Sequence, residues 1–227
     1  MDNDNSNNSN SINSDRSQLA IAHASAMEWV QSPSPTVWRK RFEHIGEAEK
    51  GLVTSLVRYD AGSQFPSHGH PEGEELFILE GTFSDEHGDF PAGSYLLNPR
   101  GFEHAPFSRA GCTLFVKLRQ YGGERHVAVD TNQAEWRAHA VAGVEVVPLY
   151  RSDDSPEEIK LVRIAAGARI PTVEFPAGEE IFVLSGSFED EHGRYGKYSW
   201  VRYPAGSAHA PHTAEGCTLY VKKGHLG

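Results

Sequence analysis

The chain has 227 residues, of which 38% are hydrophobic, and its 21 basic and 31 acidic residues give a formal net charge of −10. That charge disfavours a sequence-independent grip on nucleic acid or on an anionic membrane surface, and no apolar run approaches the length of a membrane-spanning helix. The two cysteines, Cys112 and Cys217, are too few for a disulfide framework and are expected to be small buried groups. Because the N-terminus lacks the basic and apolar regions of a secretory signal, we expect a cytoplasmic protein.

The sequence begins with a stretch rich in Asn, Ser and Asp, which covers residues 1–18. This composition offers little apolar surface to bury, so we expect a disordered tail there. Trp29 and Trp38 follow on either side of a Ser-Pro-Ser-Pro segment, and we expect them to pack this N-terminal arm against the first folded domain. The basic run at residues 39–41 indicates a solvated edge or an ion-pair network.

After the tail, the chain is a tandem repeat. A shift of 105 positions aligns residues 56–117 with residues 161–222 without a gap. Across residues 81–117, 18 of 37 positions are then identical, which indicates a duplication. We therefore expect an N-terminal domain over residues 19–122 and a C-terminal domain over residues 123–227.

Each repeat consists of short β-prone segments separated by Gly, Pro and Asp turns. The segment Asp85-Glu86-His87-Gly88 predicts a hairpin loop, with His87 as a solvated turn residue. A weak helical pattern at residues 132–140 predicts a short helix between the repeats. With 22 glycines and 13 prolines, the chain is expected to be all-β and to form two tandem jelly-roll barrels. The expected strands include residues 52–58, 75–79, 112–118 and 218–222.

The first repeat contains a cluster of candidate metal ligands. His68 and His70 are two residues apart, so on a β-strand both imidazoles leave the same face. Glu74 lies an even number of residues from both histidines, so its carboxylate is expected on the same face, whereas that of Glu75 is expected on the opposite face. His104 follows as a fourth donor. Three imidazoles and one carboxylate suit a divalent transition metal, iron or zinc first, with manganese, nickel and copper as alternatives.

The second repeat keeps only half of this ligand set. Two of the four positions hold apolar side chains, so we expect one metal ion per chain, bound by the N-terminal domain. The degenerate C-terminal domain then serves as a packing partner or offers an apolar pocket. The equivalent positions are His68 and Val173, His70 and Phe175, Glu74 and Glu179, and His104 and His209.

The same residues carry a resemblance to the cupins. The first segment fits the cupin pattern of Gly, five residues, His-x-His, three residues, Glu, six residues and Gly, and this spacing favours Glu74 over Glu72. The second fits the partner pattern, in which Gly93 and a Pro-x-Gly precede His104. The resemblance implies a bicupin, with a metal-binding cupin followed by a degenerate one. The first motif runs from Gly62 to Gly81, and the second from Gly93 to His104.

Several longer segments resemble one branch of the family, the ChrR-like cupins. In ChrR, a cupin with the same ligand set follows a zinc-binding anti-sigma domain that uses a His and a Cys-x-x-Cys. The ligand set maps here onto His68, His70, Glu74 and His104. The chain has no Cys-x-x-Cys, so the resemblance gives little support to an anti-sigma role. The resembling segments include residues 37–41, 55–59, 65–71, 83–86 and 111–118.

Many cupins with three His and one Glu are dioxygenases, so the resemblance implies a metal-dependent dioxygenase that acts on a small chelating substrate. The alternative is a ChrR-like sensor that binds metal or ligand without catalysis. Under both hypotheses we expect a small-molecule ligand or substrate and neither a nucleic-acid nor a membrane partner. Both are compatible with a homodimer. Asn98, Arg100 and Glu103 occur only in the metal-competent repeat. Glu103, Arg100 or Tyr95 could orient substrate or move a proton, and the spacing does not single one out.

Overall fold

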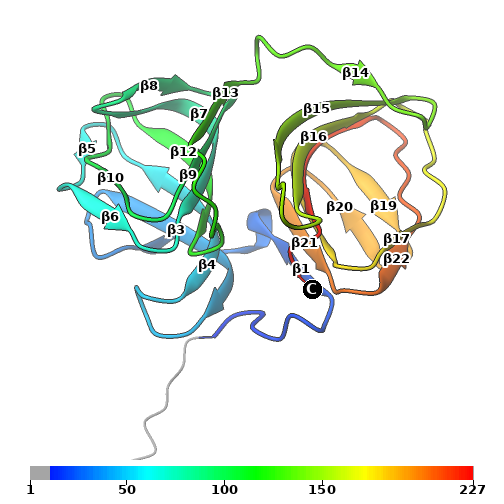
Figure 1. Cartoon of the computed structure of the whole chain (residues 1–227), viewed down its shortest axis with the longest axis horizontal. Coiled ribbons are helices and arrows are strands. Elements are labelled where there is room, and N and C mark those ends of the chain that lie inside the picture. The colour runs from blue at the N-terminus through cyan, green and yellow to red at the C-terminus, as the bar shows by residue number, and fades with distance from the viewer. Residues whose placement is uncertain (1–10, 227) are drawn as a thin grey trace, which may run out of the picture.

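The chain folds into two antiparallel β-barrels that lie side by side (Figure 1). The computed structural model describes residues 11–226. Its regular elements are strands, apart from the short 3-10 segment η1 (Ala24–Ala26). The all-β fold with two tandem barrels is therefore confirmed, as is the hairpin in which Asp85 pairs with Gly88.

The first barrel consists of one large antiparallel sheet and a two-stranded ribbon. Cys112, Leu114 and Val116 alternate along one central strand and pack into the interior of this barrel, whereas Phe115 packs on the opposite face. Burial on both faces explains the nearly continuous apolar run of this strand. The strands are β2 (Val30–Gln31), β3 (Val37–Ile45), β4 (Leu52–Tyr59), β5 (Ser63–Gln64), β6 (His68–His70), β7 (Glu74–Asp85), β8 (Gly88–Pro91), β9 (Ser94–Asn98), β10 (Phe102–His104), β11 (Phe107–Ser108), β12 (Cys112–Leu118) and β13 (Val127–Asp130). The main path of the sheet is β13-β9-β7-β12-β4-β3-β2, and the ribbon is β10-β6.

The second barrel repeats this plan. Cys217, Leu219 and Val221 fill its interior, and Tyr220 between them faces the other way. Both cysteines are free and buried, and burial raises the pKa of Cys112 to about 11 and that of Cys217 to about 12. The strands are β1 (Ala20–His23), β14 (Arg137–Ala138), β15 (Val144–Arg151), β16 (Glu158–Ile164), β17 (Val173–Phe175), β18 (Glu179–Gly186), β19 (Phe188–Asp190), β20 (Gly193–Tyr195), β21 (Ser199–Tyr203), β22 (Ser207–His209) and β23 (Cys217–Lys223). Its sheet runs β1-β21-β18-β23-β16-β15-β14, with the ribbon β17-β22.

The two repeats exchange their leading strands. β1 precedes the first barrel in the chain but pairs with β21 of the second, where Ala20 lies opposite Arg202. β13 precedes the second barrel but pairs with β9 of the first, where Val127 lies opposite Leu97. These pairs occupy equivalent positions in the repeat, so the exchange is reciprocal. The expected ranges 19–122 and 123–227 therefore mark the repeats, whereas each barrel takes one edge strand from the other range.

The interface between the barrels is also reciprocal. Lys117 on β12 binds Glu180 on β18, with Nζ 2.6 Å from Oε2. The equivalent Lys222 on β23 binds Glu75 on β7, with Nζ 2.9 Å from Oε2. Both lysines are fully buried. Apolar side chains surround these ion pairs, and the ring of Phe115 stacks on that of Phe182 at 4.3 Å between centroids. The second barrel thus packs against the first through charged and aromatic contacts.

The expectation of a disordered tail is wrong for residues 11–18, while residues 1–10 lie outside the described part of the chain. Ile12 forms a β-bridge with His44. Arg16 pairs with the buried Glu43, with Nε 3.1 Å from Oε1. The fully buried Arg202 donates to the backbone carbonyl of Asp15 at 2.8 Å. Arg202 also pairs with Glu43, so two arginines converge on this buried carboxylate and hold the segment. Composition alone does not reveal such partners.

The N-terminal arm packs on the first barrel as predicted. The ring of Trp29 lies beneath Lys40 and Arg58, whose charged groups are each 4.8 Å from its centroid. The basic run at residues 39–41 contributes two arginines to ion pairs with Glu49. The ion-pair interpretation of this run is therefore confirmed.

The short helix predicted for residues 132–140 is wrong. The segment forms a turn and then β14, which pairs with β15. Asn132 donates its backbone N–H to Asp130 Oδ1 at 3.0 Å, and Thr131 donates its N–H to the Gly93 carbonyl at 3.0 Å. These bonds use the donors that would have begun a helix, and they tie the segment to the first barrel.

Candidate metal centre

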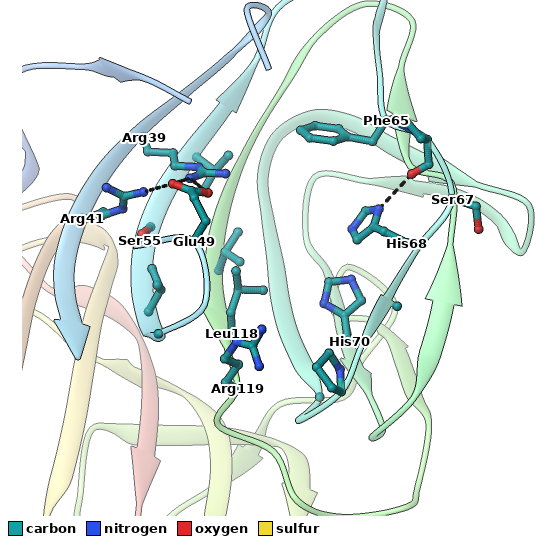
Figure 2. A pocket seen from close by; sticks show the side chains of 18 residues that line it. Arg39, Arg41, Glu49, Ser55, Phe65, Ser67, His68, His70, Leu118 and Arg119 are labelled. Carbon is teal, nitrogen blue, oxygen red and sulfur yellow. Dashed lines mark hydrogen bonds and ion pairs between the residues drawn. The ribbon is translucent and has the colours of Figure 1, made fainter. Parts of the chain in front are cut away.

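The ribbon of β6 and β10 brings three imidazoles of the first barrel together. His68 lies directly opposite His104 in the antiparallel register, and His70 follows two residues along the same face. The ring centroids are 4.9 Å apart for His68 and His70, 5.1 Å for His68 and His104, and 5.0 Å for His70 and His104. Figure 2 shows His68 and His70 one above the other on one wall of a cavity. The structure thus brings together the three histidines that the sequence predicted.

Glu74, the predicted fourth ligand, is buried at the start of β7 beside two of these rings. Its Oε2 lies 3.5 Å from His70 Nε2 and 3.6 Å from His104 Nε2. Asn98 donates Nδ2–H to the same oxygen at 3.0 Å and so orients the carboxylate. Glu75 faces the other barrel instead, where it binds Lys222. Glu74 is therefore the carboxylate that the fold presents to the imidazoles.

Hydrogen bonds on the outer ring nitrogens orient two of the imidazoles. His68 Nδ1 lies 3.0 Å from the Pro66 carbonyl oxygen, and His104 Nδ1 lies 3.1 Å from Asp85 Oδ2. A proton on each Nδ1 would donate to these oxygens and leave the Nε2 lone pair free for a metal. Asp85 was read from the sequence only as part of a hairpin. Its second role as a ring-orienting acceptor depends on a fold contact between β7 and β10.

The electrostatics of the cluster suit a bound cation. Burial and the neighbouring imidazoles lower the pKa of His70 to about 3, so this ring is neutral at physiological pH. Burial opposes the charge of His104, but the hydrogen bond to Asp85 raises its pKa overall. Burial also raises the pKa of Glu74. A divalent ion at the centre of the cluster would reverse this last effect and stabilise the carboxylate form.

The donor spacing fits a transition metal. His70 Nε2 and His104 Nε2 are 3.1 Å apart. Two nitrogens bound to one metal at about 2.0–2.1 Å are separated by roughly 3 Å, which matches this distance. One nitrogen from each of the three rings lies within 4.8 Å of the others. With the carboxylate of Glu74 beside them, these residues could hold one divalent transition-metal ion.

The cluster lies beside a cavity of about 370 Å³. His68 and His70 line one wall, and Arg39, Arg41 and Ser55 lie across from them (Figure 2). Arg119 lines it near Leu118. A small molecule in this cavity would contact the imidazoles of His68 and His70 directly. The sequence assigned Arg39 and Arg41 only to a solvated edge or an ion-pair network and did not single out Ser55, because only the barrel places β3 and β4 opposite β6.

Three predicted substrate-orienting residues lie elsewhere. Tyr95 is fully buried and donates to Glu75 at 3.0 Å, away from the imidazoles. Glu103 lies opposite Gly69 on β6 and so projects from the other face of the ribbon. Arg100 is exposed in the turn before β10. None of the three is among the described residues that line the cavity, so the structure does not support their expected roles.

The second barrel replaces this cluster with a closed ion pair. His209 Nε2 lies 2.9 Å from Glu179 Oε2, and its Nδ1 lies 3.1 Å from Asp190 Oδ2. Burial opposes protonation, but these two carboxylates raise the pKa of His209 to about 9. The ring of Phe175 packs against that of His209 at 5.2 Å. Within residues 11–226, the three-histidine group of the first barrel is the only group of its kind. The adjoining cavity of about 180 Å³ is walled mostly by aliphatic side chains.

Two copies of one sequence family cover nearly the whole chain. The ChrR Cupin-like domain matches residues 17–122 and again residues 124–227. The chain belongs to this family. The match confirms the resemblance and the tandem arrangement. A search of curated proteins found no match.

Solved structures share the two-barrel fold at low sequence identity. A "putative dioxygenase" from Nostoc punctiforme is 16% identical, with a TM-score of 0.74 over 92% of this chain and 84% of that one. The bacterial pirin YhhW from Escherichia coli, in complex with nickel(II), is 16% identical, with a TM-score of 0.66 over 91% and 99%. The protein Ylba from E. coli is 14% identical, with a TM-score of 0.70 over 96% and 95%. These likenesses establish the bicupin fold. Across residues 11–226, no helix has the length and apolar character needed to cross a membrane.

Proposed function

We propose that this bicupin is a metal-dependent dioxygenase that acts on a small chelating substrate. One divalent transition-metal ion, iron in the catalytic form, would be held by His68, His70, Glu74 and His104. The observation that carries the proposal is the convergence of three imidazoles and a buried carboxylate beside a cavity of about 370 Å³. A two-barrel neighbour described as a "putative dioxygenase" is in keeping with it.

The cavity favours a reactive site over a closed structural one. Structural zinc sites are enclosed by four protein ligands, whereas catalytic sites leave a position open. Here the side of the cluster that bears His68 and His70 faces the cavity. His68 is exposed, while His104 is buried. A ligand can therefore approach the cluster from one direction, which a purely structural site does not need.

The chain's own residues would prepare this site. When bound, the metal would supply a centre at which substrate and dioxygen can meet. Asp85 and the Pro66 carbonyl fix the rings of His104 and His68, and Asn98 fixes the carboxylate of Glu74. The ring of Phe65 also lies beside that of His68, at 6.0 Å between ring centroids. Such fixed geometry lowers the cost of orienting the reactants.

Oxygen uptake by iron-reconstituted protein tests this proposal. We expect a small substrate with two adjacent oxygen atoms to trigger oxygen consumption in the wild type and not in His104→Ala. The matched control is His209→Gln, which changes the equivalent position of the second barrel and should retain activity. Tightly bound zinc that iron cannot replace, together with no substrate-dependent uptake, would instead favour the ChrR-like sensor.

A further inference from the structure

The wall of the cavity opposite the imidazoles carries three polar side chains. Arg39 and Arg41 on β3 and Ser55 on β4 all line it. Arg41 lies directly opposite Ser55 in the antiparallel register, so their side chains are neighbours on one face. These residues form what we call the polar wall.

The second barrel shows that the fold does not require the two arginines of this polar wall. In its register, Val146 lies opposite Val162 and Pro148 opposite Lys160, as Arg39 lies opposite Val57 and Arg41 opposite Ser55. The barrel that lost two imidazoles thus also lacks both arginines. The equivalent cavity is lined by Val144 and Val146 on this strand, and by Lys160 at the position of Ser55. Imidazoles and arginines occur together in one barrel and are replaced together in the other, which indicates that they serve one ligand.

Two polar atoms of this wall have no hydrogen-bond partner among residues 11–226. They are Ser55 Oγ, in a residue that is 1% exposed, and Arg41 Nε. A buried polar atom without a partner is costly, and native proteins leave few of them. Both atoms can donate a hydrogen bond, and Arg41 Nε can only donate. The complementary ligand group is therefore an acceptor, and an anionic oxygen fits best beside a guanidinium.

The arginines of the polar wall already hold one carboxylate. Glu49 lies in the loop between β3 and β4, and its oxygens are 2.7 Å from Arg39 Nη1 and 2.7 Å from Arg41 Nη2. Its side chain is 44% exposed, and its backbone φ of 61° lies in the left-handed region that non-glycine residues rarely adopt. This contact shows that the guanidinium groups are spaced to receive a carboxylate. It uses none of the donors at Ser55 Oγ and Arg41 Nε.

We propose that the ligand of the first barrel is a small carboxylate that spans the cavity. Its chelating oxygens would face the imidazoles, and its carboxylate would accept hydrogen bonds from Ser55 and Arg41. The inference rests on the proposed metal site and adds the charge class of the substrate. The cavity of about 370 Å³ is large enough for such a molecule, because a cavity of about 150 Å³ already holds benzene.

Two probes that share a chelating group test the inference without turnover. The protein is loaded with zinc, which has no redox chemistry, and its zinc content is measured. Calorimetry then compares 3,4-dihydroxybenzoate with 3,4-dihydroxybenzamide, which differ only in the group opposite the catechol: an anionic carboxylate with two acceptor oxygens in the first, and a neutral amide with one acceptor oxygen in the second. We expect the wild type to bind the carboxylate about tenfold to a hundredfold more tightly, the range typical of hydrogen bonds to charged groups.

Three variants assign that preference to the polar wall. Arg41→Met should reduce it to less than about threefold, and Ser55→Ala should reduce it by about threefold to tenfold. Arg109→Gln removes the same charge from a side chain that is 74% exposed and outside the lining of the cavity, so it should keep the full preference. Circular dichroism of each variant checks that it is folded.

The outcomes separate this inference from the proposed function. Equal affinity for both probes in the zinc-loaded wild type overturns the carboxylate assignment and leaves the metal site standing. Zinc retained with no binding of either probe also overturns it. A preference that survives in both Arg41→Met and Ser55→Ala places the selectivity elsewhere and refutes the role of the polar wall. Failure to hold zinc overturns the metal site itself, and the inference falls with it.

Discussion

Removal of the buried amine of Lys117 should expose how strongly the two barrels depend on their reciprocal ion pairs. Lys117 Nζ lies 2.6 Å from one oxygen of Glu180 and 2.8 Å from the other. Breaking a buried pair by removing one partner costs about 3–5 kcal/mol. Glu180 would keep two donors, Trp200 Nε1 at 2.7 Å and His225 Nε2 at 2.6 Å. We therefore expect Lys117→Met to lower the free energy of unfolding by about 3 kcal/mol, the lower end of that range.

The equivalent substitution in the second barrel supplies an internal comparison. Lys222 Nζ contacts two carboxylates, Glu75 at 2.9 Å and Glu157 at 2.8 Å. Lys222→Met leaves both without their cation, so we expect a loss of about 5 kcal/mol. Two lysines at equivalent positions should thus differ in their effect, because they neutralise different numbers of carboxylates.

Urea unfolding followed by tryptophan fluorescence measures these losses, and the four tryptophans of the chain include Trp200, whose indole is buried beside Glu180. The double variant Lys117→Met/Glu180→Gln removes the uncompensated charge and keeps an acceptor for the indole, so it should regain about 2 kcal/mol over the single variant.

Lys117 holds the pKa of Glu180 well below its usual value, although burial alone would raise it. The wild type therefore loses this stabilisation as pH falls below about 4.3, and the difference between wild type and Lys117→Met should shrink there. A single variant as stable as the wild type, or a double variant less stable than the single one, would refute the reasoning.

Three further predictions concern the metal centre, the second barrel and the strand exchange. Asp85→Asn should weaken metal affinity about tenfold to a hundredfold in a chelator competition, because it disturbs the acceptor that orients His104; unchanged affinity would contradict this role. The pKa of His209 is raised to about 9, so its stabilisation is present below about pH 6.5 and lost as pH rises through 9. The wild type should therefore lose about 3 kcal/mol more than His209→Gln between pH 6 and 10 in urea unfolding, and parallel profiles would contradict it. Residues 1–122 and 123–227, co-expressed as separate chains, should copurify as a one-to-one complex because each barrel needs the other repeat's strand; independent monomers in size-exclusion chromatography would contradict the exchange.

Much of this architecture could be predicted because the chain repeats itself. The gap-free alignment of the halves fixed equivalent strands, and strand parity placed His68 and His70 on one face, as the register of β6 confirms. The same alignment correctly separated the three-histidine barrel from the one with His209. These predictions rest on local periodicity, which the sequence records directly.

The failures arose where long-range pairing decides the structure. β1 and β13 are four residues each, and nothing local shows that they pair with the opposite barrels. Tyr95 was proposed to touch substrate but bonds Glu75 in the interface between the barrels. Alternation along a strand shows which residues share a face of the sheet. It does not show which face lines the barrel and which lies in the interface, because both faces are buried here.

In the candidate site, too, some residues lie in short sequence motifs and others come together only through the fold. The ligands lie in two short motifs that the sequence displays, whereas Arg41 and Ser55 lie on separate strands and meet only in the folded barrel. Asp85 reaches His104 across the same barrel. The candidate metal ligands could therefore be predicted from the sequence. The residues that orient these ligands, or that would select a small-molecule ligand, could not.

Metal content of the purified protein tests the central claim most directly. Elemental analysis of the wild type, His68→Ala and His209→Gln compares the cluster with its counterpart in the second barrel. We predict one divalent transition-metal ion per chain in the wild type and in His209→Gln, and none in His68→Ala. Metal retained by His68→Ala, or lost from a folded His209→Gln, would contradict the assignment of the metal to the first barrel.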